Sequence, residues 1–324
     1  MSPKVIVVGT LIVDIITDKL ETIPQPGQCV IGGTSINLGG NAYSSAVNFK
    51  RLLPAVGQVI CSSIIGDDLY GKMFSDSLVG ESVDIELQLN TNGITSTNLI
   101  IQQQNEDRCY VFNPGVCDSY NSIDVNRLIN NNPANLVMFG ELPSLGLVGK
   151  SFISLISELK QKHNCLVALD TLVSESECYD WLKGNWNKID LLHCNIGEGR
   201  HITKQLDGES IAKWFFEQGV ALALVTDGAN GAHLCFQDQY FTVPTTSVKE
   251  VDATGAGDAT FAGLCVKLLE KCSDSKSLEK LSVEQVVENV KFANACGAVA
   301  VGEKGCVGEI GVKKVMELIE KINI

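Results

Sequence analysis

The chain has 324 residues, of which 45% are hydrophobic and 19% charged, so it can bury one large core. Its formal net charge of -13 at pH 7 argues against a surface that binds nucleic acid or anionic membranes. The first apolar run, 5–16, is too short to cross a bilayer and lacks the basic start of a signal peptide. We therefore expect a globular, cytoplasmic protein without nucleic-acid or membrane partners.

The twelve cysteines are scattered along the chain, and no two have C-x-x-C spacing. Most stand among apolar residues, which is typical of small core residues in a reducing compartment. The four histidines also lack the spacing of zinc ligands. We expect neither a disulfide scaffold nor a structural zinc site.

Most of the chain alternates between buried strands and amphipathic helices. Strands are expected at 4–9, 56–64, 136–139, 165–170, 189–194 and 221–226, and an antiparallel hairpin at 232–236 and 240–243. Helices are expected after residue 41 and at 69–79, 148–159, 211–217, 257–271, 283–301 and 312–322. This alternation predicts an α/β fold with a mostly parallel sheet covered by helices on both faces, in one domain over 1–324.

A second, smaller sheet is expected beside this body. Residues 17–38 carry glycine and proline breaks and no helical period, which predicts extended arms. Two β-prone runs, 95–103 and 108–112, are joined by polar residues as in a hairpin. Together they predict a lid subdomain from about 15–38 and 92–114, whose exposed edge could pair with another chain.

A stretch of small residues, D-A-T-G-A-G-D-A-T-F at 252–261, comes directly before a helical pattern. A helix that begins inside it would direct unpaired N–H groups at an anion, with Asp258 beside them. Taken alone, the same letters also describe a glycine-rich turn whose carboxylate stabilises a helix start. Neither standard nucleotide motif fits elsewhere, because G-x-G-x-x-G is absent after the first strand and Ser144 stands where a P-loop before Lys150 needs glycine.

Weaker patterns occur elsewhere, and each has an ordinary structural interpretation. Gly39-Gly40-Asn41 would let a ligand approach a helix entrance, although a plain turn with an N-cap has the same letters. Asn195 and Glu198 would share one face of a helical turn, where they could be an N-cap and its partner carboxylate. Asp14, after the first strand, and the glycines at 228 and 231 equally fit turns.

The segment 252–263 closely resembles the C-terminal signature of the ribokinase, or PfkB, family of carbohydrate kinases. Supporting matches follow the family's order along almost the whole chain: Asp14, Gly39-Gly40, Gly66-Asp67-Asp68 with Gly71, Glu141, N-x-x-E at 195–198, T-x-G-x-x-G at 226–231, and Asn294. The resemblance implies a ribokinase-like three-layer sandwich with a β lid. It also implies transfer of the γ-phosphoryl of ATP to a primary hydroxyl of a small carbohydrate.

The resemblance also implies roles for individual residues. Asp258 would be the general base, and Gly255, Ala256 and Gly257 would present N–H groups to the phosphoryl. Positions that match nucleotide contacts are Asn195, Thr226, Gly228, Gly231 and Asn294, with Glu198 holding Mg²⁺ through water. Positions that match sugar contacts are Asp14, Gly39, Gly40, Asn41 and Glu141. Asp252 and Thr254 match a monovalent-cation loop, so K⁺ is a candidate activator beside Mg²⁺ and ATP.

Departures from the family pattern limit what the resemblance implies about the sugar. Ser44 stands where the family usually has an asparagine in the second half of its first signature, and Asn41 stands where ribokinase has lysine. Residues 171–174 also lack the asparagine and arginine that many members show. We expect a sugar kinase whose pocket differs from that of ribokinase. A nucleoside kinase or a catalytically silent sugar-binding regulator would share this fold, and a homodimer through the lid is compatible with it.

Overall fold

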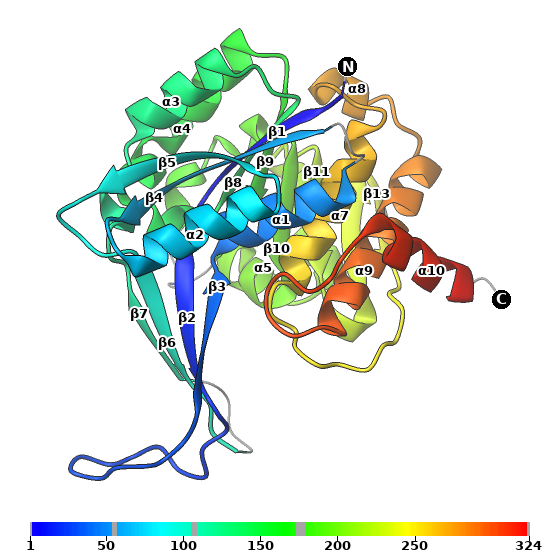
Figure 1. The fold of residues 1–324 in the computed structure, drawn as a ribbon. Coiled ribbons are helices and arrows are strands. Elements are labelled where there is room, and N and C mark those ends of the chain that lie inside the picture. Colours follow the sequence, from blue (N-terminus) through cyan, green and yellow to red (C-terminus); the bar gives the residue numbers. More distant parts are fainter. Residues whose placement is uncertain (1, 54–56, 105–108, 173–178, 323–324) are drawn as a thin grey trace.

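The computed structural model describes residues 2–53, 57–104, 109–172 and 179–322, which form two sheets of unequal size (Figure 1). In order across the larger sheet, the strands are β13 (Gln239–Val243), β12 (Ala232–Phe236), β11 (Leu222–Thr226), β10 (Leu191–Asn195), β9 (Leu166–Asp170), β8 (Leu136–Gly140), β1 (Lys4–Val8), β4 (Gln58–Gly66) and β5 (Asp84–Asn90). All neighbours pair in parallel except β11 with β12 and β12 with β13. The predicted mostly parallel sheet with an antiparallel edge hairpin is confirmed.

Helices cover both faces of this sheet, because buried strand residues alternate between two apolar cores. In β1, Val5 and Val7 enter one core, and Ile6 and Val8 enter the other. The first core is closed by α1 (Asn41–Leu52), α2 (Leu69–Gly80), α7 (Ala256–Leu269), α8 (Ser275–Leu278), α9 (Val283–Val301) and α10 (Val312–Ile322). The second is closed by α3 (Ser122–Asn131), α4 (Gly146–Lys162), α5 (Ile196–Thr203) and α6 (Gly208–Glu217). The predicted ribokinase-like sandwich has this three-layer build.

The smaller sheet projects away from the body (Figure 1). Its order is β3 (Thr34–Gly39), β2 (Ile12–Thr17), β6 (Ser96–Ile101) and β7 (Cys109–Asn113), and only β2 and β6 are parallel. The register places Asn37, Asp14, Asn98 and Phe112 in one row, and the adjacent row holds Ile36, Ile15, Leu99 and Val111. Because neighbouring rows point to opposite faces, the sheet has one face with polar groups around Asp14 and one apolar face.

Some predicted elements were wrong in place or extent. Asp14 comes after the first strand, as expected, but it lies inside a second strand, β2, and not in a turn. The arms at 17–38 are strands only at their ends, and 18–33 contain just one isolated bridge, at Leu20. Prolines and Gly27 in this stretch account for the break, since proline cannot donate to a ladder. The strand predicted at 56–64 begins two residues later, and Val56 lies outside the described residues.

Four elements of the body were missed by the prediction: β5, α3, α5 and the four-residue α8. β5 is an edge strand rich in polar residues, so its apolar signal is weak. α3 is likewise rich in asparagine and depends on its N-cap, Asn121. The 3₁₀ turns are Cys117–Ser119, Leu142–Ser144, Asp180–Leu182, Trp186–Lys188 and Gly228–Asn230.

Nine of the described cysteines are buried, as expected for small core residues, whereas Cys29 and Cys109 are exposed. The described cysteines are all free thiols, and Cys178 lies outside the described residues. Within the described part of the chain, no helix has the length and apolar character needed to span a membrane.

Candidate active site

The start of α7 is shaped by a left-handed glycine. Gly255, the N-cap, has φ 77°, and a Cβ there would come 2.2 Å from the carbonyl oxygen of Cys306. Only glycine adopts this conformation readily in so little space. The N–H groups of Gly257 and Asp258 donate to no acceptor within the described residues, whereas that of Ala256 is already used within the turn. The helix therefore offers unbonded N–H groups to an anion.

Asp258 stands beside these groups with both carboxylate oxygens held by α1. Asn41 Nδ2 donates to Oδ1 at 2.6 Å, and Ser44 Oγ donates to Oδ2 at 2.7 Å. Burial raises the pKa of Asp258 well above its ordinary value, and the nearby charge of Asp170 raises it further. The arrangement is a buried proton acceptor next to an anion site.

Asn41 links this carboxylate to a second one. Its Nδ2 also donates to Asp170 Oδ2 at 2.9 Å. Its Oδ1 faces Gly140, where a Cβ would lie 1.5 Å from it, and it accepts no hydrogen bond from the described residues. The structure thus engages the amide of Asn41 with two carboxylates, and its predicted contact with sugar stays a prediction.

Glu141 adds a third carboxylate from the end of β8. Its φ is 51°, and its Oε2 accepts the N–H of Asn41 at 3.4 Å. Burial raises the pKa of Glu141 to about 8, and Asp258 is the next cause. Because three carboxylates accept hydrogen bonds from Asn41, two from its side chain and one from its backbone, the cluster favours protons, cations or hydroxyl donors.

The lid contributes Asp14, whose Oδ1 accepts a hydrogen bond from Asn98 Nδ2 at 3.3 Å. A Cβ on Gly39 would meet Asp14 Oδ2 at 2.6 Å, so the glycine leaves room for this carboxylate. Gly40 has φ 84° and is the N-cap of α1. Burial raises the pKa of Asp14 to about 6. Asp14, Gly39 and Gly40 form one group at the junction of lid and body.

Asn195 and Glu198 form a capping box at the start of α5. Asn195 Oδ1 accepts the N–H of Glu198 at 2.9 Å, and Glu198 Oε2 accepts the N–H of Asn195 at 3.0 Å. Thr171 Oγ1 also donates to Glu198 Oε2, at 3.0 Å. Burial raises the pKa of Glu198 to about 7. The structural role suggested by the spacing is present, and the same carboxylate faces the cavity described below.

The remaining predicted nucleotide positions are Thr226 at the end of β11, Gly228 and Gly231 in the turn that follows, and Asn294 inside α9. Thr226 Oγ1 lies 3.1 Å from His193 Nε2. Gly228 and Gly231 both have positive φ, and a Cβ on Gly231 would clash with Val243 O at 2.2 Å. Asn294 Nδ2 donates to that same Val243 oxygen at 2.8 Å. Asn294 therefore holds the segment after β13 in place beside the cavity.

Asp252 and Thr254 belong to the loop before α7. Asp252 Oδ1 accepts the N–H of Thr254 at 3.0 Å, and its Oδ2 accepts the N–H of Gly305 at 3.1 Å. The carbonyl oxygen of Val301 accepts the N–H groups of Val251 and Asp252. These bonds hold together the two loops that the resemblance assigns to a monovalent cation.

A cavity of about 680 Å³ connects most of these groups. Its described lining includes the predicted residues Asn41, Glu141, Asn195, Glu198, Thr226, Gly228, Gly231, Gly255, Ala256, Gly257, Asp258 and Asn294. That lining does not include Asp14, Gly39, Gly40, Asp252 or Thr254. The body residues are thus brought together around one space, while the lid group and the Asp252 loop flank it.

Two residues of this cavity, Asp170 and His193, were missed by the sequence interpretation. Asp170 Oδ1 lies 2.6 Å from His193 Nδ1, and both side chains are buried. Burial lowers the pKa of His193, but the charge and hydrogen bond of Asp170, together with the charges of Glu198 and Asp258, outweigh this effect, so the pKa is raised overall. Asp170 ends the predicted strand 165–170, so the rule applied to Asp14, a carboxylate at a strand's carboxyl end, could have found it.

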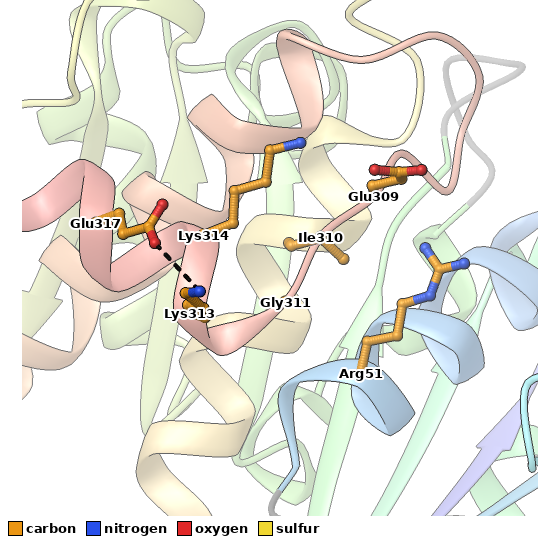
Figure 2. A pocket seen from close by; sticks show the side chains of 7 residues that line it. All are labelled: Arg51, Glu309, Ile310, Gly311, Lys313, Lys314 and Glu317. Atoms are coloured by element: carbon orange, nitrogen blue, oxygen red, sulfur yellow. Dashed lines mark ion pairs between the residues drawn. The ribbon is translucent and has the colours of Figure 1, made fainter.

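A second hollow, of about 540 Å³, lies on the surface between α1 and the start of α10 (Figure 2). Its cations are already paired: Arg51 Nη2 lies 2.5 Å from Glu81 Oε1, Lys313 lies 3.9 Å from Glu317, and Lys314 contacts Glu303. Because each of these cations is paired with a carboxylate, the hollow has little net charge with which to attract a ligand. The cavity at α7 is therefore the better candidate for chemistry.

The chain was compared with known proteins. The family described as "pfkB family carbohydrate kinase" matches residues 2–310. Fructokinase-1 of Zea mays is 25% identical over 296 residues, covering 87% of this chain and 88% of the relative. The fold is similar to that of the ribokinase of Giardia lamblia, with a TM-score of 0.83 and 17% identity over 98% of this chain and 99% of the other. It is also similar to the fructokinase of Xylella fastidiosa with bound ATP, with a TM-score of 0.80 and 18% identity over the whole of both chains. The chain belongs to the pfkB family of carbohydrate kinases.

Proposed function

We propose that this sugar kinase transfers the γ-phosphoryl of ATP to a primary hydroxyl of a small, uncharged carbohydrate, with Asp258 as general base. One observation carries the proposal: the buried carboxylate of Asp258 stands beside N–H groups at the start of α7 that donate to none of the described residues. Known structures of similar fold include a fructokinase of Vibrio cholerae with fructose, ADP and calcium, and an Arabidopsis thaliana ribokinase with ribose and ATP. These ligands support a sugar and ATP as the two substrates here.

The reaction follows from this placement. The sugar hydroxyl oxygen attacks the γ-phosphorus, its proton passes to the Asp258 carboxylate, and the bond from the γ-phosphorus to the ADP oxygen breaks. Negative charge on the transferred group would be met by the N–H groups of Gly257 and Asp258, which have no acceptor among the described residues. The two hydrogen bonds from α1 hold the base in one orientation before the substrate arrives.

The charges of the lining support an uncharged acceptor. The carboxylates in the described lining are Glu141, Asp170, Glu198, Glu250 and Asp258, and none of the described lining residues is Lys or Arg. A phosphorylated sugar would be repelled by these carboxylates and would find no Lys or Arg to pair with among the described lining residues. A neutral polyol can donate its hydroxyls to the same carboxylates. Neutral sugars are therefore proposed as substrates rather than sugar phosphates.

Glu198 suits a magnesium ion bound with ATP. Its carboxylate lines the cavity, its pKa is raised to about 7 by burial, and its Oε1 accepts no hydrogen bond from the described residues. A carboxylate in this state gains from a nearby cation. When bound, Mg²⁺ would supply positive charge that offsets the charge of the ATP phosphates. Glu198, with Asn195, would hold it through water.

Potassium activation is proposed on narrower grounds. Asp252 holds the loop of Thr254 against that of Gly305 by two hydrogen bonds, so the carbonyl groups of both loops stay close to the start of α7. A monovalent cation there would be bound by carbonyl oxygens and would add positive charge beside the anion site at the start of α7. Replacing K⁺ by a large organic cation should lower activity, and unchanged activity would refute this part of the proposal.

The apolar face of the lid supports a homodimer. Ile36 is 50% exposed and Val111 60% exposed. Both lie in the row next to that of Asp14, whose side chains point to the opposite face of the sheet. Two copies that face each other through these rows would cover the apolar surface and leave Asp14 toward the site. Sedimentation equilibrium of the wild type and of Val111→Asp distinguishes this arrangement from a monomer, since the charge should dissociate the dimer.

The whole proposal is tested by ATP consumption with pentoses, hexoses, inositol, nucleosides and phosphorylated sugars, each measured beside Asp258→Asn. Turnover of a neutral sugar that is abolished in the variant is the expected result. Turnover of nucleosides alone would make the protein a nucleoside kinase, and no turnover with any acceptor would favour a silent sugar-binding regulator. A variant as active as the wild type would refute the role of Asp258.

A further inference from the structure

The base is the end of a chain of hydrogen bonds that crosses the floor of the cavity. Thr226 Oγ1 lies 3.1 Å from His193 Nε2, and His193 Nδ1 lies 2.6 Å from Asp170 Oδ1. Asp170 Oδ2 accepts from Asn41 Nδ2 at 2.9 Å, and the same Nδ2 donates to Asp258 Oδ1 at 2.6 Å. The proposed mechanism uses only the last of these bonds. Asp170 and His193, which are both buried, have no role in that mechanism.

The carboxamide of Asn41 is the critical link, because its two ends are chemically opposite. Nδ2 has two hydrogens, and Asp170 and Asp258 take one each. Oδ1 is turned to Gly140 and accepts no hydrogen bond from the described residues. If the amide turned by half a rotation, an oxygen would face the base and repel it. Asp170 therefore fixes which end of the amide Asp258 meets.

His193 in turn fixes Asp170. Both side chains are buried, so their contact is shielded from water. The imidazole ring also stacks on Phe261 of α7, with ring centroids 5.4 Å apart and planes 26° apart. A Cβ on Gly257 would lie 2.9 Å from His193 Cε1, so the ring packs directly beneath the start of α7. The ring is held by the same helix that carries the base.

We propose that Asp170 and His193 are positioning residues of the base: His193 orients Asp170, and Asp170 orients the amide of Asn41 so that an N–H reaches Asp258. The inference rests on the proposed function, since it assigns a purpose to these residues only if Asp258 is the base. Neither residue needs to touch the acceptor for this role. Their removal should slow the chemical step while substrate binding is retained.

The test compares paired variants by steady-state kinetics with the sugar identified in the substrate screen. Asp170→Ala removes the acceptor of Asn41 and should lower kcat about 10- to 100-fold, with KM for sugar and ATP changed less than about 3-fold. Asp170→Asn keeps an oxygen that can accept from Asn41, and it should restore most of kcat. If Asp170 only contacts nucleotide or supports folding, KM for ATP or the melting temperature changes and kcat does not.

A second pair keeps the proposal testable if Asp170→Ala does not fold. His193→Leu removes the contact with Asp170, whereas His193→Gln can still donate an N–H to it. We expect kcat to fall in the first and to recover in the second. Equal kcat in His193→Leu and wild type would overturn the proposal.

Two further variants separate the possible outcomes. Asn48→Ala removes another buried amide of α1, two turns after Asn41, whose Nδ2 has no partner among the described residues, and it should leave kcat unchanged. Asp258→Asn reports on the proposed function itself. Loss of activity in Asp258→Asn with full kcat in Asp170→Ala would refute only the positioning role. Full activity in both would refute the base and with it the inference.

Discussion

The two ends of the site, Asp258 and Asp14, belong to different parts of the fold. Asp258 lies on α7 in the main body, and both of its oxygens accept hydrogen bonds of 2.6 and 2.7 Å. Asp14 lies in the four-stranded lid, where one longer bond of 3.3 Å from Asn98 holds it. Half-exposed apolar residues such as Ile36 leave the lid less packed than the body. We propose from this difference that the body, where the base is held more tightly, performs the chemistry and that the lid adapts to the acceptor.

The largest expected effect comes from removing the proposed base in the body, Asp258. Asp258→Asn keeps the shape of the side chain but removes the proton acceptor, so kcat should fall by ~10² to 10⁴-fold or more. Binding of the sugar, measured by isothermal titration in the absence of ATP, should change little. A loss of binding together with kcat would mean that Asp258 holds the substrate instead of accepting its proton.

The start of α7 should also tolerate less change than a comparable turn elsewhere. Gly255 and Gly184 have nearly the same φ, 77° and 75°, but a Cβ would lie 2.2 Å from Cys306 O at Gly255 and would meet nothing within 4 Å at Gly184. Gly184→Ala should lower the free energy of unfolding by about 1 kcal/mol for the left-handed conformation alone. Gly255→Ala should lower it by roughly 2 to 4 kcal/mol, because steric overlap is added. Urea unfolding of both variants measures the difference, and equal losses would contradict this account of the glycine.

The body of the fold could be predicted from the sequence, because its strands and helices carry strong periodic signals. The helix predicted at 283–301 has those same bounds in α9, where an apolar pattern and a capping box at Ser282 agree. β5 was missed since an edge strand with polar residues lacks such a pattern. The lid was placed in outline only, because the ends of β2 and β3 depend on pairing between distant segments and not on local propensity.

The site was predictable where chemistry is encoded by consecutive residues and not where it arises from contacts. The stretch 252–261 indicated Asp258 and its glycines as candidates. Nothing local, however, indicates that Asn41, 217 positions away, donates to that carboxylate. His193 lies in the middle of an apolar strand, so its pairing with Asp170 of the neighbouring strand becomes visible only through the parallel register. Long-range hydrogen bonds between strands of one sheet lie beyond the reach of sequence patterns.

A smaller effect is expected at the lid end. Asp14→Asn keeps the size of the side chain and its contact with Asn98 but removes the charge that would accept sugar hydroxyls. KM for the sugar should rise about 10-fold, while kcat at saturating sugar should stay within about 3-fold of the wild type, since the loss of a charged hydrogen bond is worth roughly 1.5 kcal/mol. Initial rates over a range of sugar concentrations provide the measurement. A fall in kcat that matches that of Asp258→Asn would erase the proposed difference between the two ends.

The smallest effect is a contrast in how stability depends on pH. Burial raises the pKa of Glu141 to about 8 and that of Asp14 to about 6, so both groups prefer to be protonated in the folded state. Each stabilises the fold fully below its ordinary pKa, and this contribution is lost as pH rises through the raised pKa. Between pH 6 and pH 8.5, the free energy of unfolding of the wild type should therefore fall by roughly 1 to 3 kcal/mol relative to that of Glu141→Gln, given about 1.4 kcal/mol per pKa unit. The difference in free energy of unfolding between wild type and Asp14→Asn should change little in this window, because most of the stabilisation by protonated Asp14 is already lost near pH 6.

Urea unfolding of the three proteins at both pH values, without nucleotide or divalent cations, measures these differences. Activity should run the other way, because Asp258 must lose its proton to act and its pKa is raised, so kcat/KM should increase over the same window. The body end would then gain activity as it loses stability. If the stability of Glu141→Gln relative to wild type is the same at both pH values, the charge of Glu141 does not destabilise the folded body. The contrast with the lid would then disappear.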